Sequence, residues 1–338
     1  MKKKLMSLLL AGVMAMGMVG CETSGGSDSS GKKVLYFIPI CDTGAYWSPM
    51  RKGAEDEAKA LGYDLVVKTT PPNEAQKNER HLGFIDEAVK KKVAGIAVAP
   101  MDPDMFDNKV KEAADSSIPV VTFDADVATK SNRLAYIGTN NITAGETLGE
   151  KGAEELKTKG VKHGKITLVS TNLTQTTMTY RQEGIKKGFE KVMGAEAKNF
   201  EWLEPIQDDD KSSVSKQQLE GQIVANQDMV AVFSLGSEGP DTGVMEAIKS
   251  QGMSGKISHF GFDYTSTWEN GIKDGLITGI VDQDSYTIGK TIVDVLVKKI
   301  DGKEVKDDYP IDVQWVKADQ IVKYGENKES QFSSKETK

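Results

Sequence analysis

From Val34 onward, short runs of β-branched and other apolar residues alternate with longer segments whose apolar positions recur with a helical period. The apolar runs predict strands at 34–38, 64–68, 95–99, 120–123, 134–137, 165–169, 200–203, 230–233, 257–262, 277–282 and 310–316. The periodic segments predict helices at 49–61, 74–92, 103–116, 142–159, 177–192, 214–225, 241–251, 267–274 and 285–300. Because the strand runs are continuously apolar, they indicate parallel sheets that are covered by helices on both faces.

The predicted strands are too many for one open sheet, and 338 residues exceed the length of an ordinary single domain. We therefore expect an α/β protein with two doubly wound parallel-sheet lobes. Ser48-Pro49 and Asp102-Pro103 each predict a helix start, with a capping side chain followed by a proline whose missing N–H costs nothing there. The polar sequence from Asn327 predicts a frayed tail.

The N-terminus has the features of an export signal. Three lysines at positions 2–4 precede a run of apolar and small residues, 5–19, that is short for a membrane span. The run ends in Met18-Val19-Gly20-Cys21, which resembles a bacterial lipobox, and the Ser/Gly-rich residues that follow are typical of a flexible tether. We expect a signal peptide at 1–20, lipidation of Cys21 and a tether at 21–32; an ordinary secretory signal with an incidental cysteine is the alternative.

Composition narrows the classes of function. The net charge is −7, and removing the three N-terminal lysines lowers it to −10, which disfavours binding to nucleic acid. With Cys21 lipidated, Cys41 has no partner for a disulfide. The three histidines, His81, His163 and His259, are scattered singly, and no Gly-x-Gly-x-x-Gly or Walker motif follows a predicted strand. We expect no metal and no cofactor.

Polar side chains follow the predicted strands, at the edge where an open α/β sheet binds its ligand. They comprise carboxylates, amides, hydroxyls and an aromatic pair, with Asp42, Tyr46, Trp47, Asp124, Ser237, Asp263 and Gln283 among them. Such groups bind adjacent hydroxyls, and an aromatic ring covers the C–H face of a sugar. No nucleophile stands beside a base, so the pattern predicts a neutral polyhydroxylated ligand and no catalytic residues.

Several motifs together resemble one family, the periplasmic sugar-binding proteins of the ribose type, which are solute receptors of ABC importers with the type I periplasmic binding fold. The matching pieces are Ile118-Pro-Val-Val-Thr-Phe-Asp124, Tyr136-Ile-Gly-Thr-Asn-Asn141, Ala144-Gly145, Arg181 with Gly184, Phe260-Gly-Phe-Asp263 and Gln283. The resemblance covers nearly the whole chain from Val34 to about Val316.

The resemblance implies two lobes, 33–139 plus 284–311 and 140–283 plus 312–326, followed by a polar tail at 327–338. It implies hinge crossings at Thr139, Asn140, Asp284 and Asp312. It also implies that Tyr46 and Trp47 pack on the sugar ring and that Asp124, Arg181, Asp263 and Gln283 bind its hydroxyls. Asp42, Asp209 and Ser237 are further candidates for ligand contact.

The chain departs from ribose binders at Ala125, where those proteins have an arginine, so another pentose, a hexose or another polyol is equally expected. The resemblance implies a monomeric lipoprotein that faces the periplasm or the extracellular side and delivers a monosaccharide to an ABC permease. Two alternatives remain: a receptor for chemotaxis or a histidine kinase, and a secreted glycosidase that uses Asp124 and Asp263 as its carboxylate pair.

Overall fold

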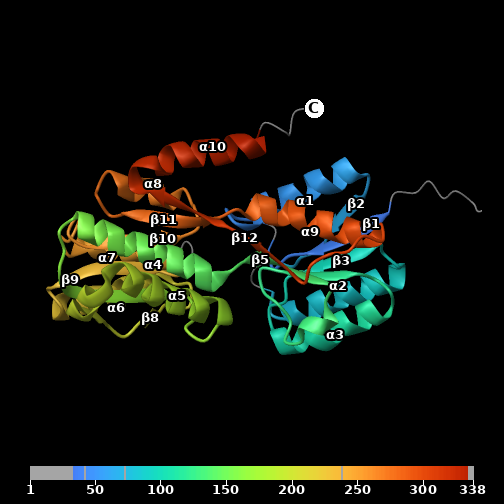
Figure 1. Ribbon diagram of the computed structural model, residues 1–338, viewed down its shortest axis with the longest axis horizontal. Coiled ribbons are helices and arrows are strands. Elements are labelled where there is room, and N and C mark those ends of the chain that lie inside the picture. The colour runs from blue at the N-terminus through green and yellow to red at the C-terminus, as the bar shows by residue number, and fades with distance from the viewer. Residues whose placement is uncertain (1–32, 42, 72–73, 237–238, 334–338) are drawn as a thin grey trace, which may run out of the picture. The chain divides into compact units, whose positions relative to one another are not determined.

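The computed structural model describes residues 33–41, 43–71, 74–236 and 239–333, and their elements form two β-sheets with helices on the faces of each (Figure 1). The predicted signal peptide, Cys21 and the tether lie outside the described residues, as do Asp42 and Ser237. None of the helices within the described ranges combines the length and apolar composition needed to cross a bilayer.

The first sheet is parallel and has the strand order β12-β5-β4-β3-β1-β2. Its strands are β1 (Val34–Ile38), β2 (Asp64–Val67), β3 (Gly95–Val98), β4 (Val120–Phe123), β5 (Ala135–Thr139) and β12 (Asp308–Ile311). Its helices are α1 (Trp47–Leu61), α2 (Lys77–Lys91), α3 (Pro103–Asp115), α9 (Ser285–Ile300) and the 3₁₀ turn η1 (Lys130–Asn132).

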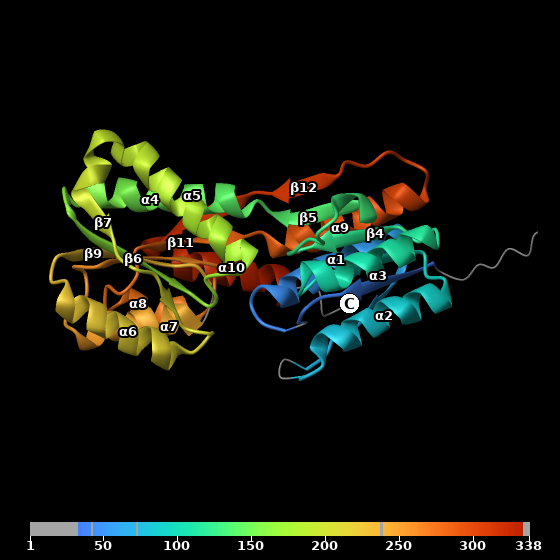
Figure 2. The same ribbon diagram turned by 90° about the horizontal axis from the view of Figure 1, so that it is seen from below.

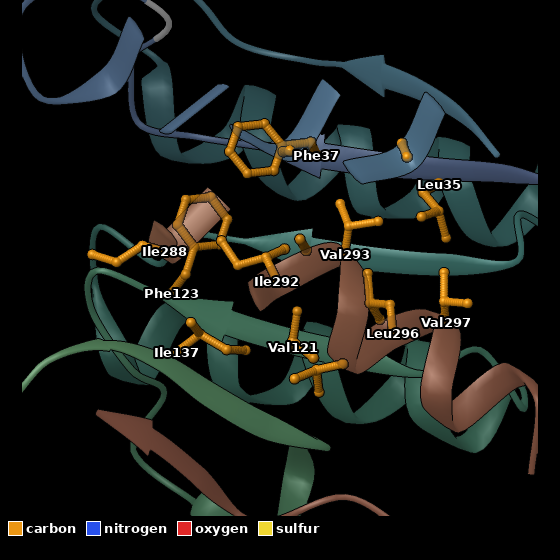
Figure 3. Close-up of a cluster of buried hydrophobic side chains, with 14 of the residues drawn as sticks. Leu35, Phe37, Val121, Phe123, Ile137, Ile288, Ile292, Val293, Leu296 and Val297 are labelled. Atoms are coloured by element: carbon orange, nitrogen blue, oxygen red, sulfur yellow. The ribbon is translucent and has the colours of Figure 1, made fainter. Parts of the chain in front are cut away.

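One core of this lobe lies between the sheet and the helices α1 and α9 (Figure 3). Phe37 of β1 and Phe123 of β4 stack with their ring centroids 4.8 Å apart, and Ile288 and Val293 of α9 belong to the same cluster. A second cluster, with Ile85 of α2, lies on the face that α2 and α3 cover. Burial on both faces explains why the inner strands β1, β3 and β4 are continuously apolar.

The second sheet has the order β13-β11-β10-β9-β6-β7, with β8 also paired to β6. Its strands are β6 (Gly164–Ser170), β7 (Phe200–Trp202), β8 (Ile206–Gln207), β9 (Met229–Ser234), β10 (Ser258–Phe262), β11 (Gly279–Gln283) and β13 (Val313–Lys317). Its helices are α4 (Asn141–Thr158), α5 (Thr176–Met193), α6 (Ser212–Ala225), α7 (Gly239–Ser250), α8 (Thr267–Ile272) and α10 (Ile321–Ser333), with 3₁₀ turns η2 (Gly194–Asn199) and η3 (Ala318–Gln320). Figure 2 shows α4 and α5 on one side of this sheet and α6 and α7 on the other.

The helices α4 and α5 approach each other closely enough that their backbones touch. A Cβ atom at Gly145 would collide with the carbonyl oxygen of Arg181, and one at Gly184 would collide with the carbonyl oxygen of Ile142. Only glycine fits at these two positions. The contact therefore fixes where α5 places Arg181 relative to the start of α4.

Within the described residues, the chain passes between the two sheets after β5, before α9, and between β12 and β13. Asn140 caps α4, its Oδ1 accepting a hydrogen bond from the Thr143 N–H at 3.1 Å. Asp284 caps α9 in the same way through the Thr287 N–H at 3.0 Å. Asp312 lies between β12 and β13. The expected hinge residues thus stand at the passages, and their role in motion stays a prediction.

Three local predictions were wrong. Ser48 does not cap the first helix: its N–H bonds to the carbonyl oxygen of Gly44, so α1 already begins at Trp47. The single strand predicted at 310–316 is two strands, because β12 pairs in parallel with β5 whereas β13 pairs antiparallel with β11 in the other sheet. The predicted cap at Asp102 is confirmed, since its Oδ1 accepts from the N–H groups of Asp104 and Met105.

The third wrong prediction concerns the tail. Residues 327–333 belong to α10 rather than to a structureless polar segment. Over 321–328, where burial is described, the buried stripe is narrow: Ile321 and Gly325 are buried and Tyr324 is partly buried. The sequence of the helix lacks the broad apolar face by which surface helices are recognised.

Candidate ligand-binding site

Two aspartates end corresponding strands of the two sheets. Asp124 follows β4 and Asp263 follows β10, and each N–H donates to the next strand along, at Ile137 O (3.3 Å) and Val281 O (2.8 Å). Both residues have left-handed backbone angles, with φ of 64° and 60°. This conformation is uncommon for residues other than glycine, although aspartate tolerates it better than most. The same uncommon turn thus stands at the same place in both sheets.

The aromatic pair lies beside the first of these carboxylates. The Tyr46 hydroxyl donates to Asp124 Oδ1 at 2.9 Å. The Trp47 ring contacts the Tyr46 ring edge-on, with centroids 5.1 Å apart, and its centroid is 6.5 Å from that of Phe123 in the core. Both side chains are partly exposed. Trp47 is thus held between two rings while part of its surface remains available to a ligand.

Arg181, in the second turn of α5, is 5% exposed and held from three sides. Its Nε donates to Asn141 Oδ1 at 2.9 Å, and its Nη1 donates to the carbonyl oxygen of Leu235 at 2.7 Å. The guanidinium carbon lies 4.1 Å from the centroid of the Phe262 ring, a cation–π contact. These hydrogen bonds use two of the five guanidinium N–H donors, so the group is fixed with donors left for a ligand.

Asp263 and Gln283, at the ends of β10 and β11, are the pair from the second sheet. The Gln283 Nε2 donates to both carboxylate oxygens of Asp263, at 2.9 and 3.1 Å, and both side chains are buried. The indole N–H of Trp268 donates to the backbone oxygen of Asp263 at 3.0 Å. The carboxylate is therefore oriented by its neighbour on β11, and the backbone of Asp263 is held by the first turn of α8.

Electrostatic coupling joins these groups into one site. Burial raises the pKa of Asp124 from 3.8 to about 6, and the Asp263 charge raises it further, while the Tyr46 hydrogen bond and the Arg181 charge oppose the shift. Burial also raises the pKa of Asp263, again against the charge of Arg181. Burial and both carboxylates raise the pKa of Tyr46, so its hydroxyl stays protonated. The site thus combines two carboxylates and one guanidinium from both sheets.

Asp209, the remaining candidate that the structure describes, has no described contact with this group. Asp209 is exposed and accepts a hydrogen bond from Gln207 Nε2 at 2.8 Å. Its neighbour Asp208 is fully buried, and one of its carboxylate oxygens has no hydrogen-bond partner. Burial raises the pKa of Asp208. The sequence pattern singled out this acidic turn but gave no basis for telling its three members apart.

A cavity of about 530 Å³ lies next to Asp124. Its walls come from both lobes, and they include Ala125, Tyr136, Asn141, Thr176 and Tyr180. The Tyr136 hydroxyl donates to the backbone oxygen of Asp124 at 3.1 Å. Ala125, the residue after Asp124, has its small side chain at the wall of this cavity.

Sequence profiles of known families were compared with the chain. The profile described as periplasmic binding protein domain matches residues 35–304. The chain belongs to this family. It is similar to the ribose import binding protein of Salmonella typhimurium, at 25% identity over 93% of this chain and 98% of that protein. The resemblance to ribose-type sugar-binding proteins and the predicted fold class are confirmed.

Solved structures give the same result for the fold. A solute-binding protein of an ABC transporter from Burkholderia graminis, in complex with D-arabinose, has a TM-score of 0.74 at 27% identity, covering 86% of this chain and 97% of that one. GanP, a glucose-galactose binding protein from Geobacillus stearothermophilus, has a TM-score of 0.73 at 25% identity, covering 86% and 99%. Both resemble the periplasmic binding protein described here over nearly their whole length.

Sequence reasoning missed two residues of this periplasmic binding protein that shape the site. Asn141 orients Arg181, and Tyr136 supports the backbone of Asp124. Both lie in the Tyr136–Asn141 motif, which was interpreted only as a strand followed by a hinge. For Asn141 the available signal was position, since it follows the carboxyl end of β5 (Ala135–Thr139); Tyr136 lies within the strand and carried no such signal.

One serine–histidine pair occurs among the described residues, at Ser234 and His259, with Oγ and Nε2 2.7 Å apart. Both side chains are fully buried, and the His259 ring lies against Trp268 with centroids 5.0 Å apart. Burial lowers the pKa of His259 to about 3, so the ring is neutral. The pair therefore packs in the interior, where a substrate has no access. Separately, the described residues contain no cluster of three or more His, Cys, Asp or Glu side chains that could hold a metal ion.

Proposed function

We propose that this protein reversibly binds a monosaccharide between its two lobes and delivers it to an ABC permease. The observation that carries the proposal is the convergence of Tyr46, Asp124, Arg181, Asp263 and Gln283 on one site. Carboxylates and amide oxygens accept hydrogen bonds from sugar hydroxyls, and the guanidinium donates to their oxygens. Two carboxylates against one guanidinium disfavour an anionic ligand.

The ligand we propose is a pentose other than ribose, or a hexose. Ala125 borders the cavity beside Asp124, and a small side chain there leaves room for a ring substituent that a long side chain would displace. The relatives named for ribose and the solved structures named for D-arabinose and for glucose and galactose support a sugar as the class of ligand.

The mechanism we propose is closure of the lobes about Thr139, Asn140, Asp284 and Asp312. Each of these positions lies where the chain passes between the sheets. A ligand that contacts residues of both lobes binds the closed form better than the open one, and its binding energy shifts the equilibrium accordingly. The closed form then offers both lobes to the permease.

We further propose that the protein is a monomer held at the outer face of the cell membrane by a lipid on Cys21. The basic residues, the apolar run and the cysteine that follows them support this anchor. Expressed in a bacterium fed a labelled fatty acid, the protein is expected to carry the label and to fractionate with membranes. Cys21→Ala should remove the label, and an equally labelled Cys21→Ala protein would contradict the anchor.

The function is tested by a thermal-shift screen against pentoses, hexoses and cyclitols, because a ligand that binds only the folded state raises the melting temperature. One or more sugars are expected to raise it. Calorimetry with that sugar should then show Asp263→Ala and Trp47→Ala weakening the affinity by about 1–3 kcal/mol each, since a buried partner or ring contact is lost.

Asp115→Ala is the matched control, because Asp115 is an exposed residue at the end of α3 whose ion pair with Lys111 lies on the surface. Its affinity should equal that of the unchanged protein. If Asp263→Ala and Trp47→Ala bind the sugar as tightly as Asp115→Ala does, neither Asp263 nor Trp47 contacts the ligand. If the protein hydrolyses an aryl glycoside and Asp124→Asn abolishes this activity, the protein is a glycosidase and the proposed receptor function is wrong.

A further inference from the structure

The helix α10 docks specifically against the residue that follows Asp263. The Tyr324 ring contacts the Tyr264 ring edge-on, with centroids 5.9 Å apart, and Ile321 at the start of the helix is fully buried. A Cβ atom at Gly325 would collide with the hydroxyl oxygen of Tyr264. Figure 1 shows α10 beside α8, the helix that begins a few residues after Asp263.

Asp282 connects this helix to the sheet. It is 2% exposed, and both of its oxygens are engaged. Its Oδ1 accepts from the backbone N–H of Tyr264 at 2.7 Å, and its Oδ2 accepts from the Tyr324 hydroxyl and from Lys328 Nζ, both at 2.6 Å. Lys328 also lies 5.8 Å from the centroid of the Tyr264 ring. Charge-assisted bonds of this length to a buried carboxylate are among the strong hydrogen bonds of proteins.

The same carboxylate is adjacent to the candidate site on two sides. Along β11, Asp282 immediately precedes Gln283, whose amide holds the Asp263 carboxylate. Across the sheet, Asp282 accepts a hydrogen bond from the N–H of Tyr264. Tyr264 directly follows Asp263, and Asp263 is the residue with the left-handed backbone. The Asp282 carboxylate therefore helps to fix both Asp263 and its partner, and its own position depends on α10.

We propose that Tyr324 and Lys328 are positioning residues of the ligand site, which act through Asp282 to hold the Asp263–Tyr264 backbone and so the orientation of the Asp263 carboxylate. The inference rests on the proposed function, because it concerns the affinity of that site. Without Lys328, the buried charge of Asp282 loses its counter-charge close to Asp263. The directions of the pKa shifts of Asp263 agree, since the Asp282 charge raises that pKa and the Lys328 charge lowers it.

The test compares Lys328→Met and Tyr324→Phe with Lys323→Met, a lysine that is exposed on the same helix. Calorimetry on the full chain, with the sugar that gives the largest thermal shift, is expected to show at least tenfold weaker binding for Lys328→Met and three- to tenfold weaker binding for Tyr324→Phe. Lys323→Met should bind within twofold of the unchanged chain. In an Asp282→Asn background, Lys328→Met should cause no further loss, because both changes act on one contact.

Amide hydrogen exchange of the ligand-free protein supplies a readout that needs no sugar. The Tyr264 N–H should exchange at least tenfold faster in Lys328→Met and at the unchanged rate in Lys323→Met. If Lys328→Met fails to fold, Tyr324→Phe carries the test, because it removes only a hydroxyl. Unchanged affinity and exchange in the folded variants would overturn the positioning role and leave sugar binding intact. A chain that binds none of the sugars would instead overturn the proposed function, while the exchange result would still decide whether α10 holds this backbone.

Discussion

Replacing Arg181 with methionine is expected to weaken sugar binding by roughly 100- to 1,000-fold, which corresponds to about 3–4 kcal/mol. The guanidinium is buried, fixed by Asn141 and Leu235, and its charge opposes the pKa increase of both Asp124 and Asp263. Methionine keeps much of the side chain's length but removes the guanidinium charge that favours the ionised form of both buried carboxylates. Calorimetric titration of the unchanged chain and the variant measures the loss directly.

Arg133→Met is the matched control, because Arg133 is the other buried arginine with described contacts and pairs with Asp126 and Asp308 in the first lobe. Its loss should lower the melting temperature and change the affinity far less than the loss of Arg181. Arg181→Met with an affinity within threefold of the unchanged chain would show that Arg181 supports the packing of α5 and does not bind the ligand.

Most elements could be predicted because the period of the apolar residues is a property of the local sequence. Val120–Phe123 and Ser285–Ile300 were predicted with the bounds that the structure has. The strand is buried throughout, and the buried positions of the helix recur with a helical period, so the pattern leaves little choice of conformation. The cap at Asp102 was also predictable, since its acceptor bonds N–H groups only two and three residues further along.

The elements that sequence reasoning missed depend on partners that are distant in the chain. Nothing local divides 310–316 into two strands, because each half is specified by the strand it pairs with, β5 for one and β11 for the other. The helix α10 is fixed by an ion pair between Lys328 and Asp282, 46 positions apart, rather than by a broad apolar face. Such pairings become visible only when the fold has brought the partners together.

The candidate site divides in the same way. Asp124 and Asp263 could be singled out because the ends of parallel strands meet at one edge of a sheet. Gln283 was singled out on the same ground, but its contact with Asp263 was not, and Asn141 was missed altogether. Gln283 reaches Asp263 from the neighbouring strand β11, and Asn141 reaches Arg181 from helix α4, so both contacts appear only in the folded chain. Whether Asp208 or Asp209 is buried depends on a shift of one residue in a turn where Asp209 and Asp210 have left-handed backbones, and the sequence does not fix such a shift.

Sugar affinity is expected to fall about tenfold per pH unit below about pH 6, the slope that a single required deprotonation gives. The relevant group is Asp124, whose pKa burial raises from 3.8 to about 6. Its ionised form accepts from Tyr46 and has further lone pairs for a sugar hydroxyl, whereas its protonated form loses acceptor capacity. Asp124→Asn should bind more weakly at pH 7.5 and lose most of this slope, with a remainder from Asp263, whose pKa burial also raises.

Stability should move in the opposite direction, which separates this titration from acid unfolding. Because the pKa of Asp124 is higher in the folded chain than in the unfolded chain, the folded state binds the proton more tightly between about pH 6 and pH 4. The ligand-free protein should therefore gain stability relative to Asp124→Asn as the pH falls through this window, while its affinity declines. The buried histidines do not disturb this comparison, because burial lowers the pKa of His81 to about 4 and that of His259 to about 3 in the unchanged chain and in Asp124→Asn alike. An affinity that is flat from pH 7.5 to pH 5, or an equal slope in Asp124→Asn, would assign the ligand contact to another group.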